Sequence, residues 1–401
     1  MKLALLILAA GMFVGSPHCL AENTLITSMD ELRFQSPKEK ATAQLVDGKV
    51  GKAIQFKFEK EARSAFFTSN VHGTPEWDKA AGFSFWVKGD GSSSLGGLQF
   101  IYNDDYAARY DVAFPIKQTE WTKISVAWSD LIPVLPDKNN KPLGGKDGNQ
   151  PSKLSGLWIG KWWYWGEYPA CSFAIDDIRL EPTIERPAKE FKTDRPALRH
   201  VRDLLKAGKP VSVVTMGDSL TDTHHWANRK VDWPSLLKEE LQKSSKSEIT
   251  IINPAIGGTQ LRQNLVLMPR WLEKTPKPDL VTICFGGNDW DAGMRGEEFF
   301  QSMVDAVNRI QRATDGHTDV LILTTVPGAT RWETTAELAE ACRKAAKDRN
   351  VGLADLEKAF HVAGKDDPNA LFVNDRVHLS TAGHRLVADS IFKLISPMNQ
   401  K

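Results

Sequence analysis

The chain has 401 residues, of which 41% are hydrophobic and 25% are charged, values typical of globular proteins that bury a core. That length is too great for one compact domain and fits two. The formal net charge is only +1, so the basic excess expected of a nucleic-acid-binding protein is absent, and charge gives no support for attachment to a membrane surface.

Residues 1–21 have the pattern of a secretory signal peptide. Lys2 provides a positive start, residues 3–14 form an apolar run, and residues 19–21 form a small-residue cleavage site. We therefore expect a secreted or periplasmic protein. A lipid on Cys19 is the alternative, but the residues before it lack the small apolar pattern of lipoprotein processing. No later segment is long and apolar enough to be a transmembrane span.

Three cysteines follow the signal peptide: Cys171, Cys284 and Cys342. An odd number spread over two domains argues against a disulfide framework, even in an exported protein. Cys284 lies in an apolar strand pattern and Cys342 in a helical one, so we expect both to be buried apolar side chains.

Residues 22–182 show short alternating segments separated by Gly, Pro, Asn and Asp, the pattern of an antiparallel β-sandwich. The expected strands are 53–58, 82–87, 98–102, 110–114, 122–128, 156–159 and 172–180. No helix longer than a turn or two is needed. Residues 137–153 are charged and Gly-rich, which predicts a surface loop.

Three segments within these strands carry a resemblance: Phe83-Ser84-Phe85-Trp86-Val87-Lys88-Gly89, Trp121-Thr122-Lys123-Ile124 and Phe173-Ala174-Ile175-Asp176-Asp177-Ile178. In pattern, the region resembles the jelly-roll domains related to carbohydrate-binding modules. The resemblance implies a jelly-roll sandwich and, as a hypothesis, a carbohydrate ligand.

Eight of the 13 tryptophans lie in this region: Trp77, Trp86, Trp121, Trp128, Trp158, Trp162, Trp163 and Trp165. An indole offers a flat apolar platform for a sugar ring. In residues 162–165, strand alternation would direct Trp163 and Trp165 to one face, so these two are candidate substrate-binding residues. The cluster fits equally well in the sandwich core, and packing against the second domain is a third option. Trp86 and Trp128 lie in regular strands, and we expect both in the core.

Residues 183–204 contain prolines among alternating charges, which predicts a linker or a strap along the surface. From residue 205 to 397, strand-like runs alternate with helical ones, and this order gives a parallel sheet in a three-layer α/β domain. The expected strands are 211–216, 249–252, 280–285, 320–325 and 351–353. The expected helices are 233–243, 261–273, 297–312, 335–349 and 381–394.

Four polar clusters follow expected strands or precede the last expected helix: Gly217-Asp218-Ser219-Leu220, residues 253–259, Gly286-Gly287-Asn288-Asp289, and residues 375–380. The carboxyl ends of neighbouring parallel strands lie side by side, so side chains that are distant in sequence can converge on one pocket there.

In combination, these clusters resemble the blocks of the SGNH hydrolases, also called the GDSL esterases and lipases. The resemblance covers about residues 205–397 and implies that Ser219 is the nucleophile, His378 its base and Asp375 the acid. The chemistry agrees, because a serine hydroxyl needs a base to take its proton, and an imidazole needs a carboxylate to hold its tautomer. The Gly-x-Ser-x-Gly motif of α/β-hydrolases is absent.

The same resemblance implies an oxyanion hole made by the backbone N–H of Ser219, the N–H of Gly258 and the side-chain amide of Asn288. Fixed donors of this kind stabilise the charge that develops on the carbonyl oxygen. Gly257 precedes Gly258 where many members have Ser, which leaves open which glycine donates.

A metal-dependent hydrolase is an alternative raised by five residues near the same strand ends: Asp222, His224, His225, Asp289 and Asp291. Adjacent histidines cannot easily reach one ion from a regular element, and no His-x-Glu or paired-Cys spacing accompanies them. We therefore expect no metal and no cofactor. We interpret five residues as lining the substrate entrance, with ordinary surface or packing positions as the alternative for each: His224, His225, Trp226, Trp290 and Trp332.

The sequence thus predicts a secreted serine esterase that removes short acyl groups, O-acetyl above all, from a carbohydrate. The expected partner is an acylated carbohydrate or polysaccharide, engaged with help from the Trp-rich sandwich. One alternative is a lipid esterase or lysophospholipase, which an exposed apolar acyl groove would favour. Another is a glycan-binding protein with an inactive hydrolase domain.

Overall fold

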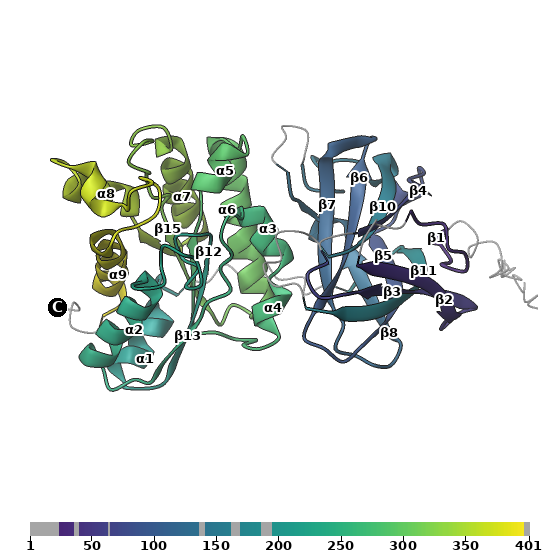
Figure 1. The fold of residues 1–401 in the computed structure, drawn as a ribbon, viewed down its shortest axis with the longest axis horizontal. Coiled ribbons are helices and arrows are strands. Elements are labelled where there is room, and N and C mark those ends of the chain that lie inside the picture. The colour runs from purple at the N-terminus through teal and green to yellow at the C-terminus, as the bar shows by residue number, and fades with distance from the viewer. Residues whose placement is uncertain are drawn as a thin grey trace, which may run out of the picture.

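The computed structural model describes residues 24–35, 40–62, 65–135, 141–161, 169–185 and 195–396. Two antiparallel sheets form the N-terminal part, and one parallel sheet flanked by helices forms the C-terminal part, side by side in an elongated molecule (Figure 1). The predicted signal peptide and the Trp163 and Trp165 platform lie outside the described residues, so both stay predictions.

The N-terminal part is a sandwich of two antiparallel sheets, which confirms the expected all-β architecture. One sheet has the order β2-β3-β11-β5-β8, with β1 paired to β11; its strands are β1 (Leu25–Thr27), β2 (Ala41–Asp47), β3 (Lys52–Phe58), β5 (Gly82–Gly89), β8 (Thr122–Ala127) and β11 (Cys171–Glu181). The other has the order β4-β10-β6-β7-β9; its strands are β4 (Ala65–His72), β6 (Leu95–Tyr102), β7 (Asp105–Pro115), β9 (Ile132–Pro133) and β10 (Leu154–Gly160).

Strand alternation decides which side chains fill the sandwich core. In β5, Phe83, Phe85 and Val87 are fully buried, whereas Trp86 points to the outer face, where Lys49 Nζ lies 5.2 Å from its ring centroid. The prediction that Trp86 belongs to the core was therefore wrong, because it lies out of phase with the buried residues. Trp128 is in the core, just after β8, and its Nε1–H donates to the Trp77 carbonyl at 3.1 Å.

The C-terminal part is built on one parallel sheet of order β13-β12-β14-β15-β16, as expected for a three-layer α/β domain. Its strands are β12 (Val211–Gly217), β13 (Ile249–Ile252), β14 (Leu280–Cys284), β15 (Asp319–Leu323) and β16 (Gly352–Ala354). One face of the sheet packs on α3 (Leu261–Val266), α4 (Pro269–Leu272), α6 (Gly296–Ala313) and α7 (Ala336–Arg349). The other packs on α1 (Arg199–Lys206), α2 (Trp233–Ser244), α8 (Leu356–Ala363) and α9 (Thr381–Ile395).

The helices differ from the expectation at several points. Two short helices were not expected, α5 (Gly287–Asp291) and α8. The single helix expected over residues 261–273 is broken into α3 and α4, because Pro269 has no N–H to continue the helical ladder and instead starts the second helix. Helix α1 begins inside the predicted linker of residues 183–204. No helix of the described residues has the length and apolar composition needed to cross a bilayer. Cys171, Cys284 and Cys342 are buried free thiols.

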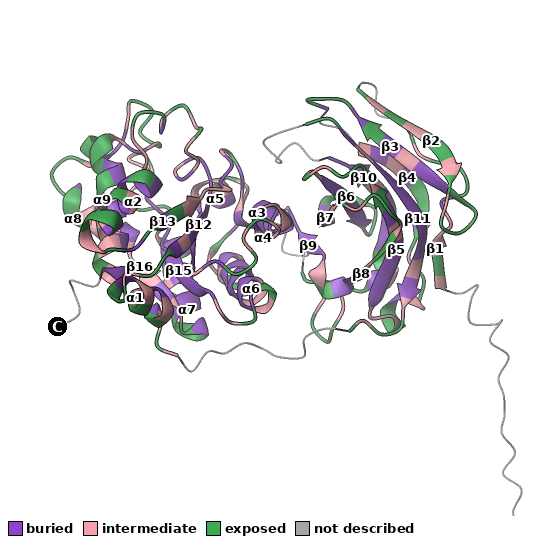
Figure 2. Cartoon of the chain, turned by 90° about the horizontal axis from the view of Figure 1, so that it is seen from below, coloured by how far each residue is buried: buried purple, intermediate pink, exposed green. Residues whose placement is uncertain are grey.

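The two parts share an apolar interface in which β7 and β9 face α3 and α4 (Figure 2). Ala113 and Ile132 of the sandwich belong to the same buried cluster as Leu265 of α3. At one end of the interface, the Arg309 guanidinium of α6 donates to the carbonyls of Asp130 (3.1 Å) and Ser129 (3.0 Å). The sandwich is thus fixed against the helices that cover one face of the parallel sheet.

Candidate active site

The candidate site lies at the carboxyl edge of the parallel sheet. Strand β12 is apolar and buried because the sheet is covered on both faces, and the chain turns sharply at its last residue, Gly217. A Cβ at Gly217 would stand 2.2 Å from Thr221 Oγ1, so a side chain there would block the turn. The turn leaves Ser219 just beyond the strand, only 9% exposed.

Ser219, His378 and Asp375 form a continuous hydrogen-bonded chain. His378 Nε2 lies 2.9 Å from Ser219 Oγ, and His378 Nδ1 lies 2.6 Å from Asp375 Oδ2. The other carboxylate oxygen of Asp375 accepts the backbone N–H groups of Val377 and His378, both at 2.9 Å. The turn that joins acid and base passes through Arg376, whose φ is 62°. The structure therefore brings together the three residues that the sequence analysis selected.

The electrostatics of Asp375 favour its ionised form. Burial alone would raise the pKa of this carboxyl, but the hydrogen bonds from the His378 ring and from the two backbone N–H groups outweigh it and hold the pKa below its ordinary value. A permanent carboxylate fixes the proton of a neutral imidazole on Nδ1 and leaves Nε2 free to accept from Ser219.

A buried asparagine that the sequence analysis did not select holds the nucleophile loop. Asn228 is 1% exposed, and its Nδ2 donates to the carbonyls of Ser219 and Asp222, each at 2.7 Å. The backbone N–H of Leu220 donates to Asp218 Oδ1 at 3.0 Å. A loop asparagine has no distinctive sequence signal, so only the folded loop shows this role.

The second cluster lies beside Ser219, since a Cβ added at Gly257 would stand 3.6 Å from Ser219 Cβ. The Gly257 N–H donates to Asp222 Oδ2 at 3.0 Å, and so it is already used. Gly258 has φ +76°, and a Cβ there would meet nothing within 4 Å, which leaves open space beside its backbone. Of the two glycines that the sequence left open, this arrangement favours Gly258 as the donor.

The amide of Asn288 is held between two acceptors. Its Nδ2 donates to the carbonyl of Thr259 at 3.0 Å and lies 3.3 Å from Asp218 Oδ2. The longer of these two contacts is the weaker, and it is the one that a substrate oxygen could replace.

Two buried acids lie beside these donors. Burial raises the pKa of Asp218 to about 6 and that of Asp289 to about 7. Asp289 Oδ1 accepts the N–H of Leu261 at the start of α3, at 3.0 Å. Asp218 and Asp289 therefore support the loops that carry Ser219 and Asn288.

The predicted entrance residues differ in whether their side chains contact the His378 ring. The ring of His225 stacks on His378 with centroids 4.4 Å apart, and Trp226, 56% exposed, meets the same ring edge-on at 5.4 Å. Burial, and then the adjacent His378, lower the pKa of His225. The side chain of His224 is 88% exposed, and the ring of Trp290 is covered by the Arg295 guanidinium at 3.8 Å. His225 and Trp226 are thus predicted entrance residues whose rings contact His378. The ring of Trp332 instead packs against His361, with centroids 4.6 Å apart.

The residues considered for a metal site take other partners in the described structure. Asp291 pairs with Arg331 at 2.5 Å, Asp289 accepts from α3, and Asp222 accepts the N–H groups of Gly257 and His224. Each carboxylate thus has a structural role that needs no ion.

Residues 215–386 match the model of the GDSL-like lipase/acylhydrolase family. The C-terminal part is therefore a GDSL domain. By this family assignment, the domain belongs to the carboxylic ester hydrolases. Ser219, Asn288 and His378 lie within the matched residues.

Solved structures of hydrolases are similar to the chain. A crystal structure of Axe2, an acetylxylan esterase from Geobacillus stearothermophilus, has 24% identity and a TM-score of 0.41, covering 47% of this chain and 96% of that chain. The lipase/acylhydrolase from Enterococcus faecalis has 20% identity and a TM-score of 0.38, with coverage of 47% and 96%. LAE5, an alpha/beta hydrolase from the metagenome of Lake Arreo, Spain, has 20% identity and a TM-score of 0.39, with coverage of 49% and 100%. No curated protein matches the chain.

Proposed function

We propose that the GDSL domain is a serine esterase in which Ser219, His378 and Asp375 are the catalytic residues. The observation that carries the proposal is the unbroken chain from Asp375 Oδ2 through the imidazole to Ser219 Oγ, with bonds of 2.6 and 2.9 Å. Both distances are within the range needed for proton transfer and for orientation of the base.

In this mechanism Ser219 Oγ attacks the ester carbonyl while His378 Nε2 takes the hydroxyl proton. The imidazolium that forms is stabilised by the Asp375 carboxylate and then gives its proton to the leaving alcohol. A water molecule then attacks the carbonyl of the acyl-enzyme, with His378 again as base, and this step releases the carboxylic acid and the free Ser219 hydroxyl.

The developing oxyanion would be met by the N–H groups of Ser219 and Gly258 and by the amide of Asn288. The positive φ and open surroundings of Gly258 support this role, since a side chain there would stand between substrate and backbone. Asn288 would exchange its 3.3 Å contact with Asp218 for one with the substrate oxygen. Because burial raises the pKa of Asp218 to about 6, that carboxyl can take up a proton near neutrality when the contact is lost.

We further propose that the substrate is a carbohydrate bearing short acyl groups, O-acetyl above all, and that the protein is secreted or periplasmic. The exposed indole of Trp226 beside His378 supports the first part, because it offers an apolar face to a sugar ring at the point of reaction. On the sandwich, Phe67, Tyr106 and Trp158 form an aromatic group with centroid distances from 4.8 to 6.5 Å, and Tyr106 is 56% exposed. This group is a second candidate sugar platform. The proposed location rests on the signal-peptide pattern.

The test compares acetate release from a panel of acetylated polysaccharides with the hydrolysis of chromogenic esters of increasing acyl length and of lysophospholipids. We expect turnover of acetyl esters and a steep fall as the acyl chain lengthens. Ser219→Ala should remain folded and lose this turnover. Full activity of Ser219→Ala would rule out the nucleophile, and a preference for long acyl chains or lysophospholipids would instead support a lipid esterase.

A variant of the entrance residue separates the carbohydrate proposal from the esterase proposal. We expect Trp226→Ala to lower kcat/KM on acetylated polysaccharide by roughly threefold to tenfold, the value of one aromatic contact, and to affect a small chromogenic acetyl ester less. Trp86→Ala, which removes an indole from the outer face of the sandwich, is the matched control. Equal losses of Trp226→Ala on both substrates would contradict a sugar platform at this position.

A further inference from the structure

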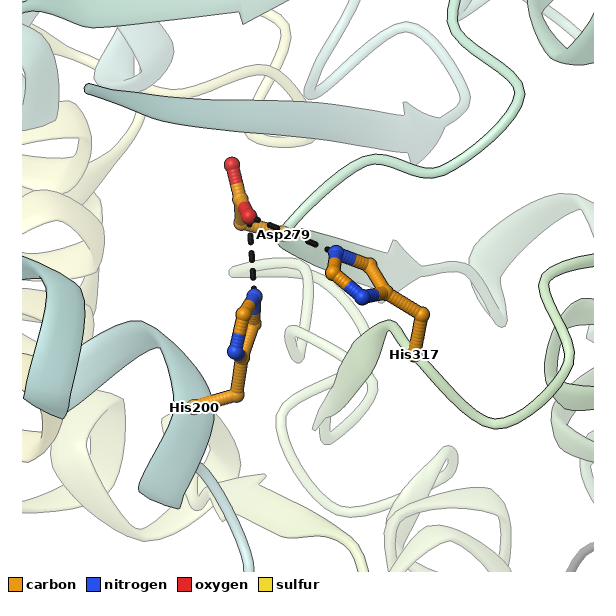
Figure 3. Close-up of side chains that lie close together, drawn as sticks. All are labelled: His200, Asp279 and His317. Carbon is orange, nitrogen blue, oxygen red and sulfur yellow. Dashed lines mark hydrogen bonds and ion pairs between the residues drawn. The ribbon is translucent and has the colours of Figure 1, made fainter. Parts of the chain in front are cut away.

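Two imidazoles and a carboxylate converge at the edge of the parallel sheet opposite to Ser219 (Figure 3). His200 lies in α1, Asp279 directly precedes β14, and His317 lies just before β15. The proposed active site follows the carboxyl ends of the strands, whereas this cluster lies at their amino ends. The five residues of β14 separate the two by roughly 16 Å at the usual rise of a strand.

The geometry of the cluster is that of metal ligands around a common point. His200 Nε2 lies 2.9 Å and His317 Nε2 3.6 Å from the same oxygen, Asp279 Oδ1, and all three ligand atoms lie within 4.8 Å of one another. Zinc bonds of about 2.0 to 2.1 Å in a tetrahedral site place ligand atoms about 3.3 Å apart. The observed separations run from 2.9 Å to at most 4.8 Å, so a bound ion would require the two rings to rotate toward a common point.

Contacts behind the ligands hold the carboxylate in place. The second oxygen of Asp279 accepts both the backbone N–H and the hydroxyl of Ser212, each at 2.8 Å. These bonds, added to the hydrogen bond from His200, outweigh the effect of burial and keep the pKa of Asp279 below its ordinary value. Hydrogen-bonded partners of this kind orient the residues that bind a metal ion.

The two histidine segments are also fixed. Arg195 Nη2 donates to the His317 carbonyl at 3.1 Å and to Asp319 Oδ1 at 2.7 Å. The other oxygen of Asp319 accepts the N–H of Val201, next to His200 in α1, at 2.9 Å. Arg195 is thus paired with Asp319.

We infer that His200 Nε2, His317 Nε2 and Asp279 Oδ1 form a binding site for one divalent transition-metal ion, with Zn²⁺ as the expected ion. Two imidazoles and one carboxylate are ligands that zinc takes readily, and three protein ligands leave a fourth position for water. The side chain of His317 is 38% exposed, so the site is accessible from solvent. Its position assigns it a structural role, in which the ion joins α1 to the starts of β14 and β15.

Coordination requires that Nε2 of each ring carry no proton, so the ring protons must lie on Nδ1 in the metal-bound form. Protons therefore compete with zinc for these ring nitrogens. Charged groups near the ligands include two ion pairs that contribute no net charge, Arg195–Asp319 and Lys277–Asp315. Lys277 and Asp315 lie two residues before Asp279 and His317 in the chain.

The experiment measures zinc bound to the purified full chain by equilibrium dialysis against ZnCl₂, followed by metal analysis. We expect one more Zn²⁺ per chain in the parent than in the variant His200→Gln/His317→Gln. Thermal unfolding of the parent should move up by roughly 5 to 10 °C at a free Zn²⁺ concentration 100 times the dissociation constant, and the double variant should not respond.

Two controls make the result specific. His361→Gln removes a partly buried imidazole that pairs with one carboxylate, Glu357, at 3.0 Å, and it should keep the parent stoichiometry. His224→Gln removes the exposed imidazole beside Asp222 and tests for zinc bound near the active site. If the double variant does not fold, Co²⁺ added to the parent should give the visible absorption of a tetrahedral site, lost on addition of Zn²⁺.

The inference is overturned if parent and double variant bind the same amount of zinc, or if Co²⁺ gives no such absorption in the parent. Either result would leave His200, Asp279 and His317 as a hydrogen-bonded group alone. Loss of zinc from His224→Gln but not from the double variant would assign the ion to the loop near Ser219 instead.

Discussion

Replacement of Asp375 by Asn tests one assumption of the proposed catalytic chain, that the Asp375 carboxylate fixes the tautomer of His378. In the parent, one carboxylate oxygen accepts two backbone N–H groups and the other faces His378 Nδ1 at 2.6 Å. We expect an Asn side chain to keep its single oxygen toward the backbone donors, because turning its NH₂ toward them would place donors against donors and break both hydrogen bonds. Its NH₂ then faces Nδ1.

A donor at that position moves the imidazole proton from Nδ1 to Nε2, so the ring can no longer accept the proton of Ser219. The loss expected for a base held in the wrong tautomer is roughly 10⁴-fold in kcat, which corresponds to about 5 kcal/mol of transition-state stabilisation. Stability should change little, because the two backbone hydrogen bonds survive.

The assay is kcat and KM on a chromogenic acetyl ester, with urea unfolding of the same preparations. Asp367→Asn is the matched control, since Asp367 accepts the backbone N–H of Asn369 in a similar turn and has no histidine partner in the described structure. We expect this control to retain parental activity. An Asp375→Asn enzyme with more than a tenth of the parental kcat would refute the reasoning about the tautomer.

Two further predictions concern Asn288 and His384. Asn288→Ala should lower kcat by roughly 100- to 1,000-fold with a smaller change in KM, because it removes one oxyanion donor, and a loss below tenfold on an acetyl ester would exclude that role. His384 is 1% exposed, and burial lowers its pKa from 6.5 to about 4, so the unfolded chain takes up its proton first as the pH falls. The free energy of unfolding therefore falls from its value at pH 7 between about pH 6.5 and pH 4, with a loss of about 2 to 3 kcal/mol at pH 4.5. Urea unfolding at pH 7 and at about pH 4.5 measures this loss, and His384→Leu should not show the part of it that comes from His384.

The strands of the GDSL domain could be predicted from the sequence because buried parallel strands are short, apolar and β-branched. Residues 249–252 were expected as a strand and form β13, and residues 211–216 form all but the last residue of β12. The same order of elements predicted that polar groups after these strands would gather at one edge. The catalytic roles of Ser219, His378 and Asp375 stay predictions, although the structure places the three in contact.

Contacts made by loop side chains were outside the reach of sequence reasoning. The Gly257 N–H is bonded to Asp222 and the ring of His225 stacks on His378, and both contacts depend on loop conformations that have no periodic pattern. The strands β2 and β4 were missed for a related reason: their alternation is weak, with several exposed or half-buried residues in succession. The outward position of Trp86 could have been deduced from its phase relative to Phe85.

The apolar contact between the sandwich and the GDSL domain has a consequence for any truncated form of this protein. Leu265, Val266 and Met268 are at most 5% exposed in the intact chain, and they lie in the buried cluster that Ala113 and Ile132 of the sandwich help to form. Expression of the hydrolase half alone would expose these three apolar side chains to water. It would also leave the Arg309 guanidinium without its two carbonyl acceptors. Such a fragment should self-associate or require detergent, so activity measurements belong to the undivided polypeptide.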